Sequence, residues 1–540
     1  MPRHTPPRPT RRARRPLCAT LALSLLLGMA PAAHSQPLPD VPSQVRLPAL
    51  GESASDDFNL STEKRLGEQI MREIRRDPDY LDDPELMDYL QSVWGPLVAA
   101  ARQRGDIGAD VQGLFPFEAF LVRDRSVNAF ALPGGFVGVH LGLIAMTSTR
   151  DELASVLAHE LSHVSQRHIA RSVTASQRSS TLGLAALILG VLAASRSSSP
   201  DAAQAAIAGS QAAVAQSQLN FSRDMEREAD RTGQALMAQA GFAPSGMAAM
   251  FSKLDNTNRL NDNGAFPYLR SHPLTIERIG EAQQRAAQSG AGGAGSTPES
   301  LRWHALMQAR ARVLMDPGVD SARRLQDLDR REGGLDERLA GLYASGLASM
   351  ALRDFTRAAQ VVATAQALPA LQQDGPARRV FSHMALRLAL ARSDRDAALR
   401  ALAAMEGDRS RSAMLLRAQV ALVTDDEAAV RRSAEALQTW VAERRLDALA
   451  WQQLAHCAER LGQPLRSVRA SAEAQAALGD LPGAIDRLRA GQQLARKGTV
   501  GGDFIDASVI DARLRELQAQ RRELMADQRG GRGNRGDAPE

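Results

Sequence analysis

Residues 157–163 read LAHELSH and contain the pattern HExxH, the strongest chemical signal in the chain. In a helix, positions four apart lie about 40° apart around the axis, so His159 and His163 would face one point. Two neutral imidazoles suit Zn²⁺, and a catalytic zinc takes a third protein ligand while leaving one position for water. Glu160 would lie beside that water as the general base of a hydrolysis. Because HExxH also arises by chance, a structural histidine pair is the alternative.

A third ligand is expected from a second helix over 220–241, where residues 226–230 read EREAD. Glu226 and Asp230 are four residues apart and share one face of this helix, and Gly233 on the same side would allow close contact with the first helix. We assign Glu226 as the third ligand and Asp230 as an acceptor that orients a zinc-bound histidine. Taken alone, the segment is also typical of a surface helix with ion pairs.

Residues 270–279 read RSHPLTIERI, a loop that turns into a helix at Pro273. His272 could bind zinc as a removable fourth ligand that keeps the site latent. It could instead donate a hydrogen bond to the oxyanion of the transition state, or have neither role. We interpret three other histidines as structural: His140, His168 and His456.

Helices and a small sheet must position these residues. Helical periodicity runs over 61–98 with a break at 82–84, and Thr149 with Glu152 forms a capping-box pattern that predicts the start of the HExxH helix. Between these helices lie three β-type runs, at 117–122, 127–132 and 136–143. A strand with an unpaired edge can accept an extended peptide through backbone hydrogen bonds, although a purely structural hairpin is the alternative. On the first reading, four residues would contact substrate: Asn128, Gly135, Phe136 and Val137.

The basic charge of the chain belongs to its N-terminus. Residues 1–35 contain six arginines and no acidic residue, so the total of +5 leaves a net charge of −1 for the rest, which argues against a nucleic-acid partner. A basic region, an apolar run and small residues before Gln36 are typical of a cleaved signal peptide, and a retained anchor is the alternative. Cleavage leaves one cysteine, Cys457, and therefore no internal disulfide.

An apolar stretch over 181–194 is too short to cross a bilayer straight. It is either a buried helix or a flap that covers the site or touches a membrane surface. With 44% hydrophobic and only 4% aromatic residues, the chain is expected to be mainly helical.

The C-terminal half shows a repeat after the sequence SGAGGAGST at 289–297. The first of two residue sets at 34-residue intervals is Leu347, Phe381, Leu415 and Leu449; the second is Ala351, Ala385, Gln419 and Gln453. This period resembles that of tetratricopeptide (TPR) repeats, helix pairs that stack into a solenoid with a concave binding face. A non-repeating helical bundle is the alternative.

The motifs NAFALPGG (128–135), HELSH (159–163), SRDMEREAD (222–230) and RSHPLTIERI (270–279) resemble the BepA family of periplasmic zinc metallopeptidases. These β-barrel assembly-enhancing proteases are relatives of the membrane-embedded HtpX and CAAX prenyl proteases. The resemblance implies a gluzincin site with one zinc on His159, His163 and Glu226, with Glu160 as base and His272 as a regulatory ligand. It also implies work in the periplasm of a Gram-negative envelope on unfolded or misassembled outer-membrane β-barrel proteins, beside the barrel-assembly machinery.

The sequence therefore predicts a gluzincin-type α+β metalloprotease domain with a small β-sheet, followed by a TPR-like solenoid for docking clients or partners. The expected boundaries are 1–35 (signal peptide), 36–59 (extended leader), 60–288 (protease), 289–300 (linker), 301–525 (repeats) and 526–540 (disordered tail). Two other functions remain open. One is a chaperone or scaffold for outer-membrane assembly with an inactive or structural metal site, and the other is a lipid-contacting factor that uses residues 181–194.

Overall fold

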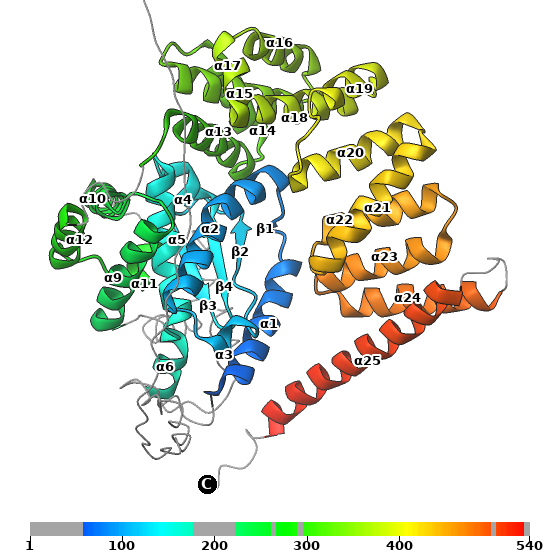
Figure 1. Cartoon of the computed structure of the whole chain (residues 1–540), viewed down its shortest axis with the longest axis horizontal. Coiled ribbons are helices and arrows are strands. Elements are labelled where there is room, and N and C mark those ends of the chain that lie inside the picture. The colour runs from blue at the N-terminus through cyan, green and yellow to red at the C-terminus, as the bar shows by residue number, and fades with distance from the viewer. Residues whose placement is uncertain (1–57, 176–221, 261–265, 289–294, 498–503, 534–540) are drawn as a thin grey trace, which may run out of the picture. The chain divides into compact units, whose positions relative to one another are not determined.

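The computed structural model describes residues 58–175, 222–260, 266–288, 295–497 and 504–533 (Figure 1). The chain is mainly helical with one small sheet, as predicted. Its N-terminal part contains the helices α1 (Leu60–Arg76), α2 (Pro84–Arg104), α3 (Ala109–Gln112), α4 (Leu141–Met146), α5 (Arg150–Ser165), α6 (His168–Ala175), α9 (Arg223–Gln239), α10 (Ser245–Leu260), α11 (Pro267–Ser271) and α12 (Ile276–Gln288).

The sheet has the strand order β1-β2-β4-β3, formed by β1 (Tyr80–Leu81), β2 (Glu118–Val122), β3 (Ala129–Leu132) and β4 (Phe136–His140). Strand β4 pairs in parallel with β2 and antiparallel with β3. The three predicted β-type runs are confirmed, except that the third becomes helix α4 at Leu141. Strand β1 has only two residues and left no periodic signal.

Two of the expected substrate residues, Phe136 and Val137, lie on the inner strand β4 and not at a free edge. Their strand is hydrogen-bonded on both sides and both side chains are buried, so it has no open backbone to offer a peptide. Gly135 forms the turn into this strand, with φ of +95°, and a Cβ there would lie 2.9 Å from Cβ of Phe115. Within the described chain the edge strands are the two-residue β1 and the longer β3, which begins next to Asn128.

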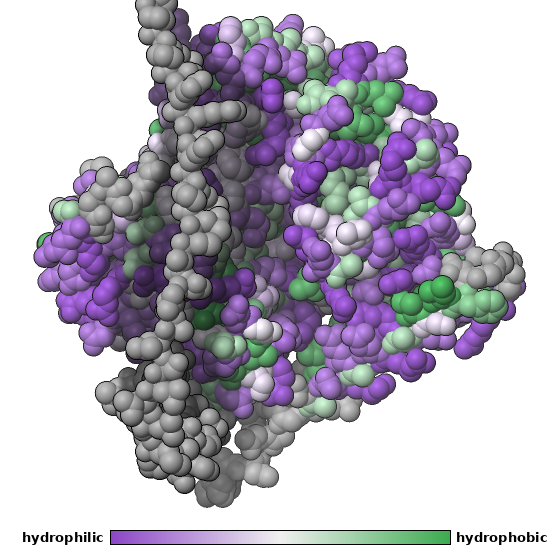
Figure 2. Space-filling view, viewed as in Figure 1, coloured by the Kyte–Doolittle hydropathy of each residue, from purple (hydrophilic) through white to green (hydrophobic). Residues whose placement is uncertain are grey.

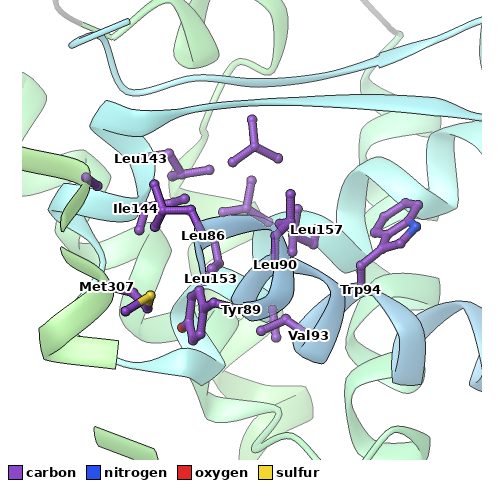
Figure 3. Packing of buried hydrophobic residues seen from close by; sticks show 14 of the residues in the cluster. Leu86, Tyr89, Leu90, Val93, Trp94, Leu143, Ile144, Leu153, Leu157 and Met307 are labelled. Carbon is purple, nitrogen blue, oxygen red and sulfur yellow. The ribbon is translucent and has the colours of Figure 1, made fainter. Parts of the chain in front are cut away.

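Helix α5 begins where the capping pattern predicts, because the Thr149 side chain accepts a hydrogen bond from the Glu152 amide. One face of α5 packs Leu153 and Leu157 into the core with residues of α2 such as Leu86 and Leu90 (Figure 3). The opposite face of this helix carries HExxH, so α5 is buried on both faces. This packing fixes the direction in which the two histidines of the motif point.

Helix α9 lies against α5 and comes as close as Gly233 allows (Figure 1). A Cβ at this glycine would lie 3.1 Å from the backbone of both Ala158 and His159. The helix begins with Ser222, whose hydroxyl accepts a hydrogen bond from the Met225 amide, and its C-terminal turn reaches Gly241 with φ of +85°. The predicted close contact of the two helices is therefore present.

The C-terminal part consists of successive helices that pack on their neighbours in sequence. Leu347, Phe381, Leu415 and Leu449 lie on α15, α18, α20 and α22, four successive first helices of pairs. The bounds are α13 (Pro298–Met315), α14 (Val319–Gln326), a 3₁₀ turn η2 (Asp327–Arg330), α15 (Leu335–Ala351), α16 (Phe355–Gln366), α17 (Pro369–Gln373), α18 (Gly375–Ala391), α19 (Arg395–Ala403), α20 (Arg411–Thr424), α21 (Glu427–Glu443), α22 (Ala448–Arg460), α23 (Pro464–Ala477), α24 (Leu481–Arg496) and α25 (Phe504–Gly533).

The predicted disordered tail from residue 526 is wrong up to Gly533, where helix α25 ends. Ile510, Leu514 and Leu517 bury one face of this helix against α24. Once these turns are formed, each further residue adds a hydrogen bond at little entropic cost, so the helix extends past the last buried residue.

Four earlier predictions lie outside the described residues: the signal peptide, nearly all of the leader, the apolar stretch 181–194 and the last seven residues. Among the helices that the structure describes, none combines the length and the apolar character needed to cross a bilayer. The surface in Figure 2 is mostly hydrophilic, with a small hydrophobic patch beside the start of α25, where Phe504 and Ile505 are exposed. Most apolar side chains of the described chain are therefore directed inward.

A buried ion network joins the start of α2 to the C-terminal helices. Arg310 of α13 donates to both oxygens of Asp83 at 2.6 and 2.7 Å, and to Glu85 at 2.8 Å. Arg387 of α18 binds the same Glu85 at 2.9 and 3.0 Å. Asp83 also caps α2 by accepting from the Leu86 amide, so one carboxylate serves both the helix start and the inter-helix contact.

Replacing Arg310 with Met should lower the free energy of unfolding by about 3–5 kcal/mol, because it leaves two buried carboxylates with incomplete compensation. Chemical denaturation measures this value. The control is Arg431→Met, whose exposed pair with Glu427 is expected to contribute about 0–1 kcal/mol. Equal effects of the two substitutions would show that the buried network does not stabilise the fold.

Candidate metal centre

Four side chains from three regions of the chain converge at one point: His159, His163, Glu226 and His272. All four are buried, and one ligand atom from each lies within 4.8 Å of the other three. Nε2 of His159 lies 2.9 Å from Nε2 of His163, and the two nitrogens lie 3.5 and 3.4 Å from oxygens of Glu226. Nδ1 of His272 is 2.9 Å from Glu226 and 3.3 Å from His159.

These separations, 2.9–3.5 Å, lie on either side of the value expected between two ligand atoms of one zinc ion. With zinc–nitrogen and zinc–oxygen distances of roughly 2.0–2.1 Å, the ligand atoms of a regular tetrahedron lie roughly 3.3–3.4 Å apart. Three imidazoles and one carboxylate are also ligand types that zinc takes. The residues present therefore fit one Zn²⁺. The cluster contains all four residues that were named as candidate ligands from the sequence.

The pKa shifts within the cluster indicate a site that can bind a cation. Although burial alone would raise the pKa of Glu226, the facing His272 and His159 lower it well below its ordinary value. Burial opposes protonation of His159, but Asp230 and Glu226 raise its pKa to about 9. Burial and the neighbouring His159 lower the pKa of His163 well below its ordinary value. A carboxylate thus faces one charged and one neutral imidazole, an arrangement in which a divalent cation can replace the proton.

Glu160 is fully buried beside the cluster, and neither of its carboxylate oxygens makes a hydrogen bond of normal geometry within the described chain. Burial raises the pKa of Glu160, while His272, His159 and the backbone N–H of Ala131 on β3 favour the charged form. Buried carboxylate oxygens normally accept hydrogen bonds, and a water molecule beside Glu160 could donate one. Its surroundings therefore suit a general base.

Asp230 lies beside the first histidine of the motif, where it could orient the ring. Its Oδ1 lies 3.0 Å from Nδ1 of His159, on the ring edge away from the ligand cluster. Arg278 of α12, which the sequence analysis did not assign, binds both oxygens of Asp230 at 2.7 and 2.8 Å. The same guanidinium lies 2.8 Å from Oε2 of Glu226. Arg278 therefore contacts both Glu226, the proposed ligand, and Asp230, the carboxylate beside His159.

His272 is held over the cluster from two sides. Arg278 donates to the Pro273 carbonyl at 2.8 Å, which ties the loop to α9 through Asp230. The ring of Tyr268, a fully buried residue that the sequence analysis missed, lies with its centroid 4.7 Å from that of His272. Nε2 of His272 is 3.5 Å from Oε1 of Glu160, so this histidine lies against both the ligand cluster and the Glu160 carboxylate.

For Arg278, one of the two residues that were not predicted, the sequence contained a partial signal. Arg278 belongs to the segment RSHPLTIERI and follows His272 by six residues, but its role depends on the packing of α12 against α9, which no local pattern reveals. His140 has a structural contact, since Ser126 lies 2.8 Å from its Nδ1.

Replacing Arg278 with Met should weaken zinc binding by roughly 10–100-fold, because Glu226 and Asp230 lose the cation that orients them. Competition with a chromogenic chelator measures the affinity. Arg278→Lys is the matched control: it keeps the charge but cannot bridge two carboxylates with a planar fork, so an intermediate affinity is expected. Unchanged zinc affinity in both variants would show that Arg278 does not orient the zinc ligands.

Comparisons with known proteins agree with this geometry. A model of peptidase family M48 matches residues 97–286. The putative beta-barrel assembly-enhancing protease of Vibrio cholerae serotype O1 is 35% identical over 318 residues, or 58% of this chain and 62% of that protein. The beta-barrel assembly-enhancing protease of Escherichia coli K12 is 28% identical over 510 residues, or 94% of this chain and 98% of that protein. The mitochondrial metalloendopeptidase OMA1 of Schizosaccharomyces pombe is 28% identical over 241 residues, or 42% of this chain and 62% of that protein.

The range matched by the family model contains the whole cluster, from His159 on α5 to Arg278 on α12. The donor set, the buried carboxylate beside it and the family match point to the same chemistry, and the resemblance inferred from the motifs is confirmed. The chain is a zinc metalloprotease that matches peptidase family M48 over residues 97–286 and resembles the beta-barrel assembly-enhancing proteases.

Proposed function

We propose that this protein is a periplasmic zinc endopeptidase that degrades or assists misassembled outer-membrane β-barrel proteins. The observation that carries the proposal is the buried cluster of His159, His163, Glu226 and His272 with the buried Glu160 beside it. The names of the relatives support the client class, and the signal-peptide pattern at residues 1–35 supports export.

In this proposal His159, His163 and Glu226 hold the zinc, which supplies Lewis acidity and lowers the pKa of a bound water. Glu160 accepts the proton of the attacking water and passes it to the leaving amine. Asp230 keeps the proton of His159 on Nδ1, which leaves Nε2 as the metal-binding atom. Arg278 holds Glu226 by its Oε2 and so fixes the direction of its other oxygen.

Substrate binding is assigned to strand β3, whose outer edge pairs with no other described strand. Ala131 on this strand lies next to Glu160, so a peptide added along β3 would pass the general base. Backbone pairing reads little sequence, which suits a protease that meets many unfolded clients. Asn128 stands at the start of this strand with a buried side-chain oxygen that has no partner among the described residues, and it remains a candidate substrate contact.

The helical pairs from α15 to α24 are proposed as TPR-like repeats that dock the client or the barrel-assembly machinery. The support is the 34-residue period, which falls on equivalent helices of successive pairs. Stacked pairs of this kind present an extended surface for a partner chain. The apolar stretch 181–194 is kept as a proposed site of membrane or active-site contact.

His272 is proposed as the latch of the resting enzyme. Its Nδ1 lies 2.9 Å from Oε1 of Glu226 and 3.3 Å from Nε2 of His159, so His272 would bind zinc beside the three proposed ligands and exclude water. Its other nitrogen faces Glu160, so the same ring covers the general base. Release of the loop at Pro273 would expose both groups together.

Glu160→Gln should reduce cleavage of an unstructured protein by about 10²–10⁴-fold while zinc content stays at one per chain, because only the proton acceptor is lost. Cleavage is measured with unfolded casein, and metal by atomic emission. Complementation of a deletion strain by this variant would favour the chaperone or scaffold function. Undiminished cleavage would eliminate Glu160 as base.

His272→Ala should raise basal cleavage of the same substrate. If the latch closes roughly nine molecules in ten, its removal raises the rate about tenfold. Zinc affinity should fall by less than in His163→Ala, because His272→Ala keeps the three proposed permanent ligands, whereas His163→Ala removes one of them. A loss of activity at unchanged zinc content would assign His272 to the oxyanion instead.

A further inference from the structure

The chain makes an unusual turn directly after the HExxH helix. Helix α5 ends at Ser165, and Arg167 then adopts φ of +53°, a left-handed conformation that is uncommon outside glycine, asparagine and aspartate. The Arg167 side chain pairs with the buried Glu63 of α1 at 2.9 Å and donates to the Phe58 carbonyl at 3.3 Å. These contacts hold the strained turn, and α6 starts at the next residue, His168.

The turn places His168 behind the second histidine of the motif. The His168 side chain is fully buried, and its Nδ1 lies 2.9 Å from Nδ1 of His163. On the other side of the ring, Nε2 of His168 lies 3.3 Å from Oε2 of Glu228 on α9. Arg171, one turn along α6, donates to the same carboxylate oxygen at 3.1 Å.

The distance between the two Nδ1 atoms restricts the tautomers. A hydrogen bond at 2.9 Å between ring nitrogens needs a proton on one of them and a lone pair on the other. His163 directs Nε2 into the ligand cluster, and a neutral imidazole that binds metal through Nε2 carries its proton on Nδ1. His163 is therefore the donor and His168 the acceptor. The proton of His168 then lies on Nε2, where Glu228 accepts it.

We propose that His168 is a positioning residue that fixes the tautomer and ring orientation of His163 for zinc. The first histidine of the motif is held by the carboxylate of Asp230, and the second by a neutral imidazole that Glu228 and Arg171 hold in turn. Metal-bound histidines depend on such outer partners for affinity. This role replaces our interpretation of His168 as purely structural, and it rests on the proposed ligation of zinc by His163.

Two amide variants of His168 distinguish a hydrogen-bonding role toward His163 from a role in packing alone. In His168→Asn the amide oxygen reaches the level of Nδ1 and can still accept from His163. In His168→Gln the amide lies at the level of Nε2, facing Glu228, and the acceptor for His163 is lost. Both variants are polar and close in size, so their difference reports the acceptor. His456→Asn, at an exposed position, is the control.

Zinc affinity, measured by chelator competition on the full chain, is the readout. We expect His168→Asn and His456→Asn within about threefold of the wild type, and His168→Gln weaker by roughly 10–100-fold. Equal affinities of the Asn and Gln variants would overturn the proposal. A wild-type chain that binds no zinc would instead refute the ligand set, so the two failures are distinguishable.

A second measurement uses the wild-type chain and does not depend on whether the variants fold. Histidine-selective ¹⁵N labelling of the zinc-loaded protein reports which ring nitrogens carry protons. The proposal expects His163 protonated on Nδ1 and His168 on Nε2. A proton on Nδ1 of His168 would overturn it, because that nitrogen could no longer accept from His163.

Discussion

The close approach of α5 and α9 is the contact on which the site depends. Helix α5 supplies two imidazoles and the proposed base. The proposed carboxylate ligand Glu226, the Asp230 carboxylate beside His159 and the partner of His168 all come from α9. Gly233 makes the approach possible, since a side chain there would meet the backbone of Ala158 and His159. The apolar face of α5 is meanwhile packed against α2, so the helix cannot move away without opening the core.

Burial of so many charges creates a second constraint, which Arg278 addresses. Glu226 and Asp230 are both buried and both contact Arg278, and two unpaired carboxylates would be costly there. Arg278 compensates both and, through the Pro273 carbonyl, also ties down the loop that carries His272. Arg278 therefore both compensates the buried carboxylates of the site and holds the loop with His272, the proposed latch.

The protease part and the C-terminal helices are joined by charge as well as by apolar contact. The start of α2 carries Asp83 and Glu85 into a set of arginines on α13 and α18, and Arg411 of α20 binds Asp82. Helix α2 also packs against α5. The same helix therefore contacts both the C-terminal helices and the HExxH helix.

The local features of the site followed from the sequence. The period of 3.6 residues per turn put His159 and His163 on one face, Thr149 marked the start of α5, and the spacing of Glu226 and Asp230 defined a second face. The three β-type runs and the 34-residue period were equally readable, because alternation and repetition are properties of neighbouring residues.

Contacts between distant segments were decided only by the tertiary structure. The order of the sheet put Phe136 and Val137 on an inner strand, since strand order depends on chain topology and not on strand composition. The roles of Arg278 and His168 depend on α12 packing against α9 and on a left-handed turn at Arg167. The sequence by itself determined which chemistry the chain carries. The fold decided which side chains hold those groups in place, because orientation is set by close packing between elements that no local pattern connects.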